Sequence, residues 1–97
     1  MKFIVLDAVD EEISADRIFY NTRDDGLGDR FVNEVIQTFE LIQAWPYVFK
    51  KLKGGYRQVG VKVFPHAVIY KIFKDGIYVV AVAPYRKKPY YWRGRKV

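Results

Sequence analysis

The chain has 97 residues, is 51% hydrophobic, carries a formal net charge of +6 and contains no cysteine. This length suits one domain, expected to span residues 1–97, and the 18% aromatic content excludes a disordered segment. Without cysteine, a disulfide framework, a thiolate nucleophile and a cysteine-based metal site are all excluded.

The first residues, 1–7, contain an apolar run that is too short for a signal peptide. Nothing in the chain approaches the ~20 continuous apolar residues of a membrane span. These features, together with the absence of cysteine, favour a protein of the reducing cytoplasm that does not contact a membrane.

The charge is divided unevenly along the chain. Residues 1–49 hold ten of the eleven acids and four bases, a net charge of −6, whereas residues 50–97 hold thirteen bases and one acid, a net charge of +12. The bases of the second half are interleaved with aromatic residues. This pattern predicts a basic face for a polyanion such as RNA, DNA or an acidic protein segment.

The first half predicts one strand and one helix. Residues 2–6 are rich in strand-forming side chains. Asp7 or Asp10 is suited to cap a helix that runs to about Thr22, with acids that complement its dipole. The side chains expected to face inward are Ile13, Phe19 and Tyr20.

A second helix is predicted from Leu27 to the stop at Pro46. Asp24 and Asp25, in the turn before it, are expected to cap and to be solvated. A short turn that contains glycine makes the two helices an antiparallel hairpin. The apolar stripe at helical spacing comprises Phe31, Val35, Phe39 and Ile42, widened by Val32, Ile36 and Trp45.

After Pro46 the period becomes that of strands. Residues 56–63 alternate, with Val59, Val61 and Val63 on one side. Residues 67–73 form the next strand, and Lys74–Gly76 is a turn signal. Residues 77–83 are almost wholly apolar, as in a central strand covered on both faces. The expected fold is therefore α+β, in the order β-α-α-β-β-β: an antiparallel helical hairpin packed on a small, mainly antiparallel twisted sheet.

Five phrases in this order resemble the RelE/ParE superfamily of toxins from type II toxin–antitoxin modules. Two of these segments lie at the start and the end of the second helix, two lie in the predicted strands, and one is the basic tail. The phrases are Gly26–Phe31, Ala44–Pro46, Phe64–Tyr70, Val80–Ala83 and Arg86–Trp92. These segments are more similar to the ParE-like sequences, which are often labelled plasmid-stabilisation proteins, than to the RelE-like ones.

This resemblance implies a growth-inhibiting toxin, held inactive by a cognate antitoxin in a hetero-oligomer, with no cofactor and no metal. ParE-like members inhibit DNA gyrase and need no comparable catalytic set. RelE-like members enter the ribosome and cleave mRNA. A nucleic-acid-binding domain that has lost toxicity is a third possibility. The antitoxin is expected on the helical hairpin and on the edge of the sheet.

Cleavage of mRNA would require groups that activate the 2′-hydroxyl, neutralise the phosphate and protonate the leaving oxygen. The resemblance offers five residues for these roles: Lys51, Lys53, Lys62, Arg86 and Tyr91. Lys62 stands where ribosome-dependent members often have arginine, and no histidine precedes the basic run at Arg86. The match is therefore partial, and gyrase inhibition is the favoured activity.

Contact with the partner or with nucleic acid is expected mainly from the basic loop, the strand after it and the tail. These residues are Lys50, Lys51, Lys53, Arg57, Lys62, Tyr85, Arg86, Lys87, Lys88 and Tyr90. His66, the only histidine, has no obvious catalytic partner, so a packed ring is favoured over a catalyst. Trp92 is expected to pack the tail against the sheet.

Overall fold

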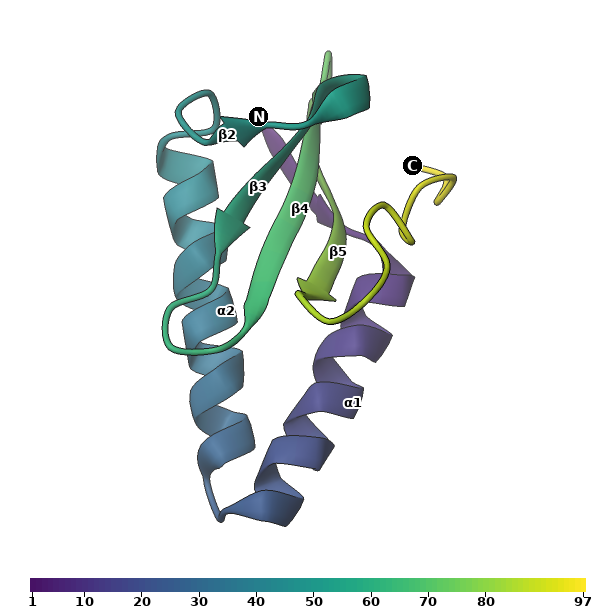
Figure 1. Ribbon diagram of the computed structural model, residues 1–97. Helices are drawn as coiled ribbons and strands as arrows, with labels where there is room; N and C mark the ends of the chain where they lie inside the picture. Colours follow the sequence, from purple (N-terminus) through teal and green to yellow (C-terminus); the bar gives the residue numbers. More distant parts are fainter.

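The computed structural model describes residues 1–97 as two helices packed on one face of a five-stranded sheet (Figure 1). The strand order is β1-β5-β4-β3-β2, with β1 parallel to β5 and every other pair antiparallel. The predicted α+β class and element order are confirmed. The elements are β1 (Lys2–Val5), α1 (Asp7–Arg23), α2 (Leu27–Ala44), β2 (Lys50–Lys51), the 3-10 turn η1 (Lys53–Gly55), β3 (Tyr56–Gly60), β4 (His66–Phe73) and β5 (Gly76–Pro84).

The helical hairpin turns at Gly26, whose φ of 82° suits glycine. The N–H of Gly28 donates a 2.7 Å hydrogen bond to the Asn21 side chain, so a residue of α1 accepts from one of the free N–H groups in the first turn of α2. The predicted capping by aspartates was wrong. Leu6 precedes α1 without a side-chain cap, and Gly26 precedes α2 in the same way. The acids of the first turn of α1 still complement its dipole.

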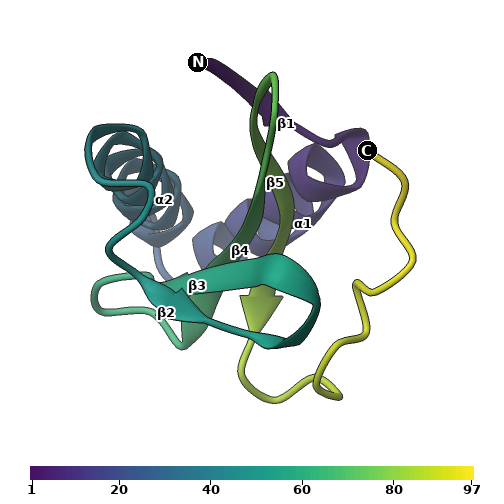
Figure 2. The ribbon, with the colours of Figure 1, turned by 90° about the horizontal axis from the view of Figure 1, so that it is seen from above.

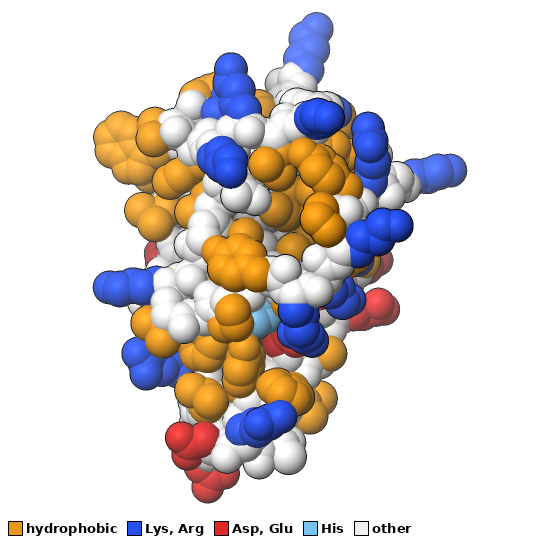
Figure 3. Space-filling model, viewed as in Figure 1, with side chains coloured by type: hydrophobic (Ala, Val, Ile, Leu, Met, Phe, Trp, Pro, Cys, Tyr) orange, Lys and Arg blue, Asp and Glu red, His pale blue; other side chains and the backbone are white.

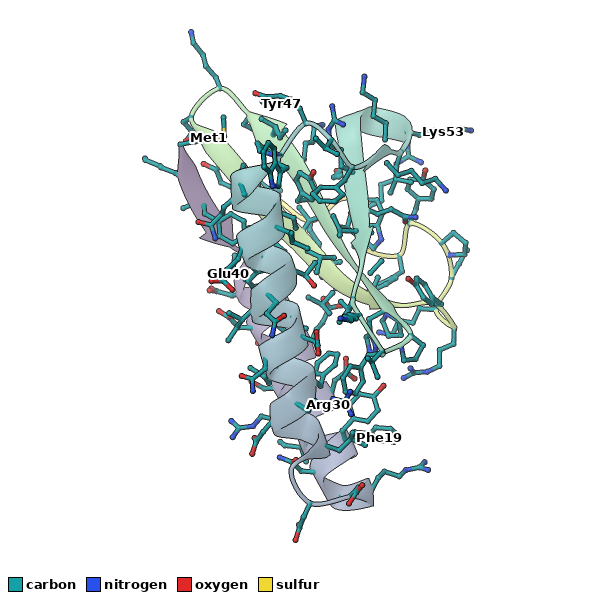
Figure 4. The ribbon with its side chains drawn as sticks, turned by 90° about the vertical axis from the view of Figure 1, so that its left-hand side faces the viewer. Met1, Phe19, Arg30, Glu40, Tyr47 and Lys53 are labelled. Atoms are coloured by element: carbon teal, nitrogen blue, oxygen red, sulfur yellow. The ribbon has the colours of Figure 1, made fainter.

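The main core lies between the helices and the sheet. Phe31, Val35 and Ile42 of α2 are buried there, as predicted, and Val9 of α1 joins them. The predicted stripe was too wide, because Ile36 is 49% exposed and Trp45 61% exposed. Phe19 was also predicted to face inward but is 50% exposed, near the hairpin turn (Figure 4). Arg23 covers its ring instead.

Strand β3 ends earlier than predicted. Val59 and Val61 are buried, but Val63 is 63% exposed and has a φ of 75°, which breaks the extended chain. Two short elements, β2 and η1, were not predicted because Lys50–Gly55 lacks any strand periodicity. Pairing with β3 makes β2 a strand.

The hairpin between β4 and β5 turns at Lys74 and Asp75, as the sequence indicated. Gly76 has a role other than the predicted turn chemistry, since it is the first residue of β5 and pairs with Lys2 of β1. A Cβ atom there would lie 2.6 Å from the Lys2 carbonyl oxygen. Glycine is therefore needed for close strand approach.

Strand β5 is buried on both faces, as predicted. Val79 and Val82 belong to the core beneath the helices, whereas Val80 and Ala81 belong to a smaller cluster with Trp92. The tail after β5 curves back along the sheet, and its end lies beside the start of α1 (Figure 2). Trp92 is only 4% exposed, which confirms its predicted packing role. Neither helix has the length and apolarity needed to cross a membrane.

Candidate partner-binding groove

An open groove of about 280 Å³ lies on the face of the sheet opposite the helices. Its floor comes from strands β3, β4 and β5, one wall from β2 and the segment after it, and the other wall from the tail. The lining residues are Lys50, Leu52, Gln58, Ala67, Ile69, Ala83, Pro84, Tyr85, Lys87, Lys88, Pro89, Tyr90, Tyr91 and Trp92.

Strand register explains how the groove obtains its polar and apolar parts. Lys50 is paired with Gln58, so their side chains project from the same face of the sheet. Ala67 is paired with Ala83, and these two small side chains leave the floor low between the walls. The result is an apolar floor with cations and tyrosines at its rim.

Two tyrosines mark the ends of the groove. Tyr85 is 63% exposed, and its hydroxyl lies 3.2 Å from the position that a Cβ atom on Gly60 would take. At the other end, the Tyr90 hydroxyl accepts a 3.2 Å hydrogen bond from the backbone N–H of Lys53. Tyr90 also has a φ of 63°, a conformation unusual for a non-glycine residue. The hydrogen bond to Lys53 and packing against Trp92, with ring centroids 5.1 Å apart, hold Tyr90 in this conformation.

The tail is held by one carboxylate, that of Glu12 in α1. Tyr91 donates a 2.6 Å hydrogen bond to Oε2, and Arg95 donates to both carboxylate oxygens at 3.1 Å. The backbone N–H of Val82 donates to Oε1 at 3.1 Å. Arg95 also donates to the carbonyl of Val80 at 2.8 Å. All these groups are largely shielded from solvent, which strengthens their interactions.

Electrostatics follow from this arrangement. Burial raises the pKa of Tyr91 well above its usual range, and the hydrogen bond to the Glu12 carboxylate raises it further. The same carboxylate raises the pKa of Arg95 through its hydrogen bonds. Tyr91 is thus neutral and Arg95 charged at any physiological pH.

A second hollow lies between α1, the end of β5 and the tail. Arg86, Lys87 and Arg95 line it together with Glu11, Glu12 and Asp16. This hollow has mixed charge, unlike the basic rim of the groove. It is therefore a poorer surface for a polyanion.

His66 lies beneath this region and is 1% exposed. Its Nε2 atom is 3.2 Å from a carboxylate oxygen of Asp16, and its Nδ1 atom has no hydrogen-bond partner. The ring packs at 4.8 Å from Phe31 and at 6.1 Å from Tyr20. His66 is a packed ring rather than an accessible base, and its burial is deeper than the half-packed position that the sequence suggested.

The residues predicted for partner contact fall into two groups. Lys50, Tyr85, Lys87, Lys88 and Tyr90 line the groove together. The others lie elsewhere: Lys51, Lys53, Arg57, Lys62 and Arg86.

Of this second group, Arg57 has an identified structural contact. Its guanidinium donates to the carbonyls of Tyr47 and Phe49, at 3.0 and 2.9 Å, and thereby holds the segment between α2 and β2. Figure 4 shows Tyr47 just beyond the end of α2 and Lys53 farther from that helix, in the turn between β2 and β3.

The five residues predicted for RNA cleavage are spread over the molecule. Lys51 and Lys53 adjoin the start of β3, whereas Lys62 follows its other end. Arg86 lines the second hollow rather than the groove. The ring of Tyr91 reaches the groove, but its hydroxyl is bonded to Glu12.

The space-filling view shows how the charges lie on this face of the molecule (Figure 3). Basic side chains surround a central apolar area, and acidic side chains appear mainly toward the helical turn and the edge by the tail. Convergence of the bases is therefore partial, because Arg57 and Arg95 are occupied by contacts within the protein.

Comparison with known proteins gave one kind of match. No family model and no curated protein matches the chain. Among solved structures, a chain from the chromosomal ParDE TA system of P. aeruginosa superposes with a TM-score of 0.78 at 11% sequence identity, covering 87% of this chain and 95% of the other. The protein has a ParE-like fold. At this identity the ParE-like similarity establishes the architecture alone, and it confirms the fold expected from the resemblance.

Several residues that shape this site were not identified from the sequence. Glu12 and Asp16 looked like ordinary acids of an exposed helix, and nothing local marked them as partners of Arg95 and His66. Fifty or more residues separate the members of each pair. A partial signal existed, because both acids follow Ala8 at the spacing of one helical face.

Proposed function

We propose that this protein is the toxin of a type II toxin–antitoxin module and that it inhibits DNA gyrase by binding it. The fold similarity to a chain from a ParDE TA system supports the first part. The second part rests on one observation: the five residues that RNA cleavage would need do not meet in the groove. Because no catalytic set is assembled there, we favour inhibition by contact with the target over cleavage.

The groove provides the contact surface for this role. Lys50, Lys87 and Lys88 supply positive charge at its rim, Tyr85 supplies an exposed aromatic face, and Tyr90 a partly exposed one. Aromatic residues anchor protein interfaces, while peripheral charges set the rate of encounter with an acidic partner. An acidic surface of gyrase, or of the antitoxin that occludes the groove, fits this chemistry.

Neutralisation by an antitoxin is supported by exposed apolar side chains on the outside of the hairpin. Ile18, Ile36 and Leu41 are 67%, 49% and 49% exposed, and Trp45 follows at the end of α2. Exposed apolar side chains on a pair of helices are residues that an added helix or strand of a partner would cover. An antitoxin that restores growth to cells with the wild-type toxin should restore it less well with Trp45→Lys.

Induction of the protein in bacteria tests the proposed activity. Gyrase inhibition predicts filamentation, a DNA-damage response and continued translation. Purified protein should then inhibit supercoiling by gyrase in vitro. Immediate loss of translation with cleaved messages would instead show that the protein is a ribonuclease. A folded product that causes no growth defect would indicate a nucleic-acid-binding domain without toxicity.

A matched pair of variants ties the outcome to the groove. Lys88→Glu reverses a charge at the rim, whereas Lys74→Glu reverses an exposed charge in the β4–β5 turn. We expect the first to weaken inhibition of supercoiling by roughly tenfold or more, and the second to leave it unchanged. Equal effects would mean that net charge alone, and not the groove, controls binding.

A further inference from the structure

The tail has no backbone connection to the sheet that it covers. Beyond Tyr85, every backbone hydrogen bond of the tail is a short-range turn contact, such as Tyr91 N–H to Lys88 and Arg95 N–H to Trp92. Hydrogen bonds from the tail to the rest of the protein come only through the side chains of Tyr90, Tyr91 and Arg95. A segment held in this way can open without unfolding the sheet.

The anchor for two of those side chains lies at a gap in the sheet. Strand β1 pairs with β5 only from Gly76 to Val79, so the rest of this edge of β5 has no neighbouring strand. Along that stretch the carbonyl of Val80 accepts from Arg95, and the N–H of Val82 donates to Glu12. The Glu12–Arg95 pair therefore replaces a missing strand.

We propose that Glu12 is a positioning residue for the groove: its carboxylate fixes the tail on β5 and thereby builds the wall that carries Lys87, Lys88 and Tyr90. Without the Glu12 carboxylate, these side chains are no longer held facing Lys50 and Gln58 across the floor of the groove. The expected loss of toxicity rests on the proposed function; the closure of the tail does not.

Hydrogen-bond geometry explains why a carboxylate is needed. Oε1 accepts from Val82 and Arg95, and Oε2 accepts from Tyr91 and Arg95. Both oxygens thus face only donors. The amide of glutamine would place an NH₂ donor against one of these donor pairs, so Glu12→Gln keeps the shape but loses half of the acceptors. This substitution is the sharpest test.

Trp92 reports directly on the tail. It packs 4.7 Å from Tyr56 and is 4% exposed, while the other tryptophan, Trp45, is 61% exposed and replaceable. In a Trp45→Phe background we expect Glu12→Gln to shift Trp92 emission toward that of a solvated indole. Trypsin cleavage after Arg86 and Lys87 should accelerate roughly ten- to a hundredfold, since hydrogen bonds to charged groups contribute on that scale.

Glu11→Gln is the matched control, because Glu11 is the exposed neighbour with no side-chain hydrogen bond. It should change neither emission nor cleavage. Arg95→Met, which removes the other partner, should free the tail as Glu12→Gln does. Far-ultraviolet circular dichroism should show that the helices persist in all three variants.

The outcomes separate this inference from the proposed function. A toxic wild type whose Glu12→Gln variant has a free tail and lost toxicity supports both. A free tail with toxicity retained overturns the positioning role. If Trp92 emission and cleavage are unchanged in Glu12→Gln, or if that variant unfolds while Arg95→Met keeps a closed tail, the inference fails whatever the toxicity. A free tail in a protein that was never toxic overturns the proposed function alone.

Discussion

Gly28 of α2 packs directly against the backbone of Arg17 in α1: a Cβ atom on Gly28 would lie 2.0 Å from the carbonyl oxygen of Arg17. No side-chain rotation relieves this contact, because the obstructing atom belongs to the backbone of α1. The hairpin, and with it the α1 face that carries Glu12 and Asp16, depends on a glycine at this position.

Gly28→Ala should therefore destabilise the protein by about 3 kcal/mol, at the upper end of ordinary overpacking. Chemical denaturation monitored by circular dichroism measures the change. Gly94→Ala is the control, since Gly94 has open space around it but a φ of 91°, so only about 1 kcal/mol of backbone strain is expected there. Comparable losses at the two positions would contradict the contact.

Arg57→Ala should lower stability by about 2 kcal/mol, because two carbonyl groups lose a charged donor. The segment from Tyr47 to Phe49 should become more accessible to hydrogen exchange. Arg57→Lys should recover little of the loss, since one ammonium cannot reproduce the guanidinium fork. If Arg57→Ala were fully stable but bound the target more weakly, Arg57 would be a partner-binding residue, as predicted from the sequence, and not a structural one.

Arg86→Ala is expected to behave in the opposite way. Arg86 is exposed and makes no hydrogen bond or ion pair within the protein, so its removal should change the melting temperature little. Toxicity should be lost if this guanidinium contacts the target. A collapse of thermal stability would instead make Arg86 a structural residue.

Asp16→Ala should cost about 1–3 kcal/mol, because it leaves Nε2 of His66 unpartnered in a buried site. His66→Phe alone should be tolerated better, since the site is lined by Tyr20, Phe31 and Phe64 and the Nδ1 atom already lacks a partner. A double-mutant cycle gives the coupling between the two residues. Strictly additive effects would show that the contact contributes nothing.

Stability should fall in alkaline solution. The pKa of Tyr91 is raised above its unfolded value of 10.0, mainly by burial, so the folded state keeps this proton when the unfolded state releases it. The contribution is complete below pH 10 and declines as pH rises from there toward the folded pKa. Tyr20 and Tyr70 act in the same direction.

Tyr91→Phe should therefore reduce the slope of unfolding free energy against pH above 10, by up to about 1.4 kcal/mol per pH unit. Equilibrium unfolding at several alkaline pH values measures the slope, and tyrosinate absorbance follows the titration. The remaining tyrosines should not compensate for the lost part of the slope. An unchanged slope would mean that the Tyr91 hydroxyl is solvated and not bonded to Glu12.

Much of the architecture was predictable, because the signals for it are local. The apolar period of α2, the stop at Pro46 and the run of β5 each depend on neighbours a few residues away. Predictions failed where tertiary contacts decide the outcome. Phe19 and Trp45 were expected to face inward with their helices but are 50% and 61% exposed, and β2 exists only through its pairing with β3.

The sequence by itself determined the type and order of the elements and the opposite charges of the two halves, since both are properties of adjacent residues. Only the tertiary structure decided which charges remain free. Glu12 and Arg95 are separated by 83 positions, and His66 and Asp16 by 50. No periodicity connects residues so far apart. Packing of α1 against the sheet and the tail brings them together, and burial there makes an unpaired charge costly.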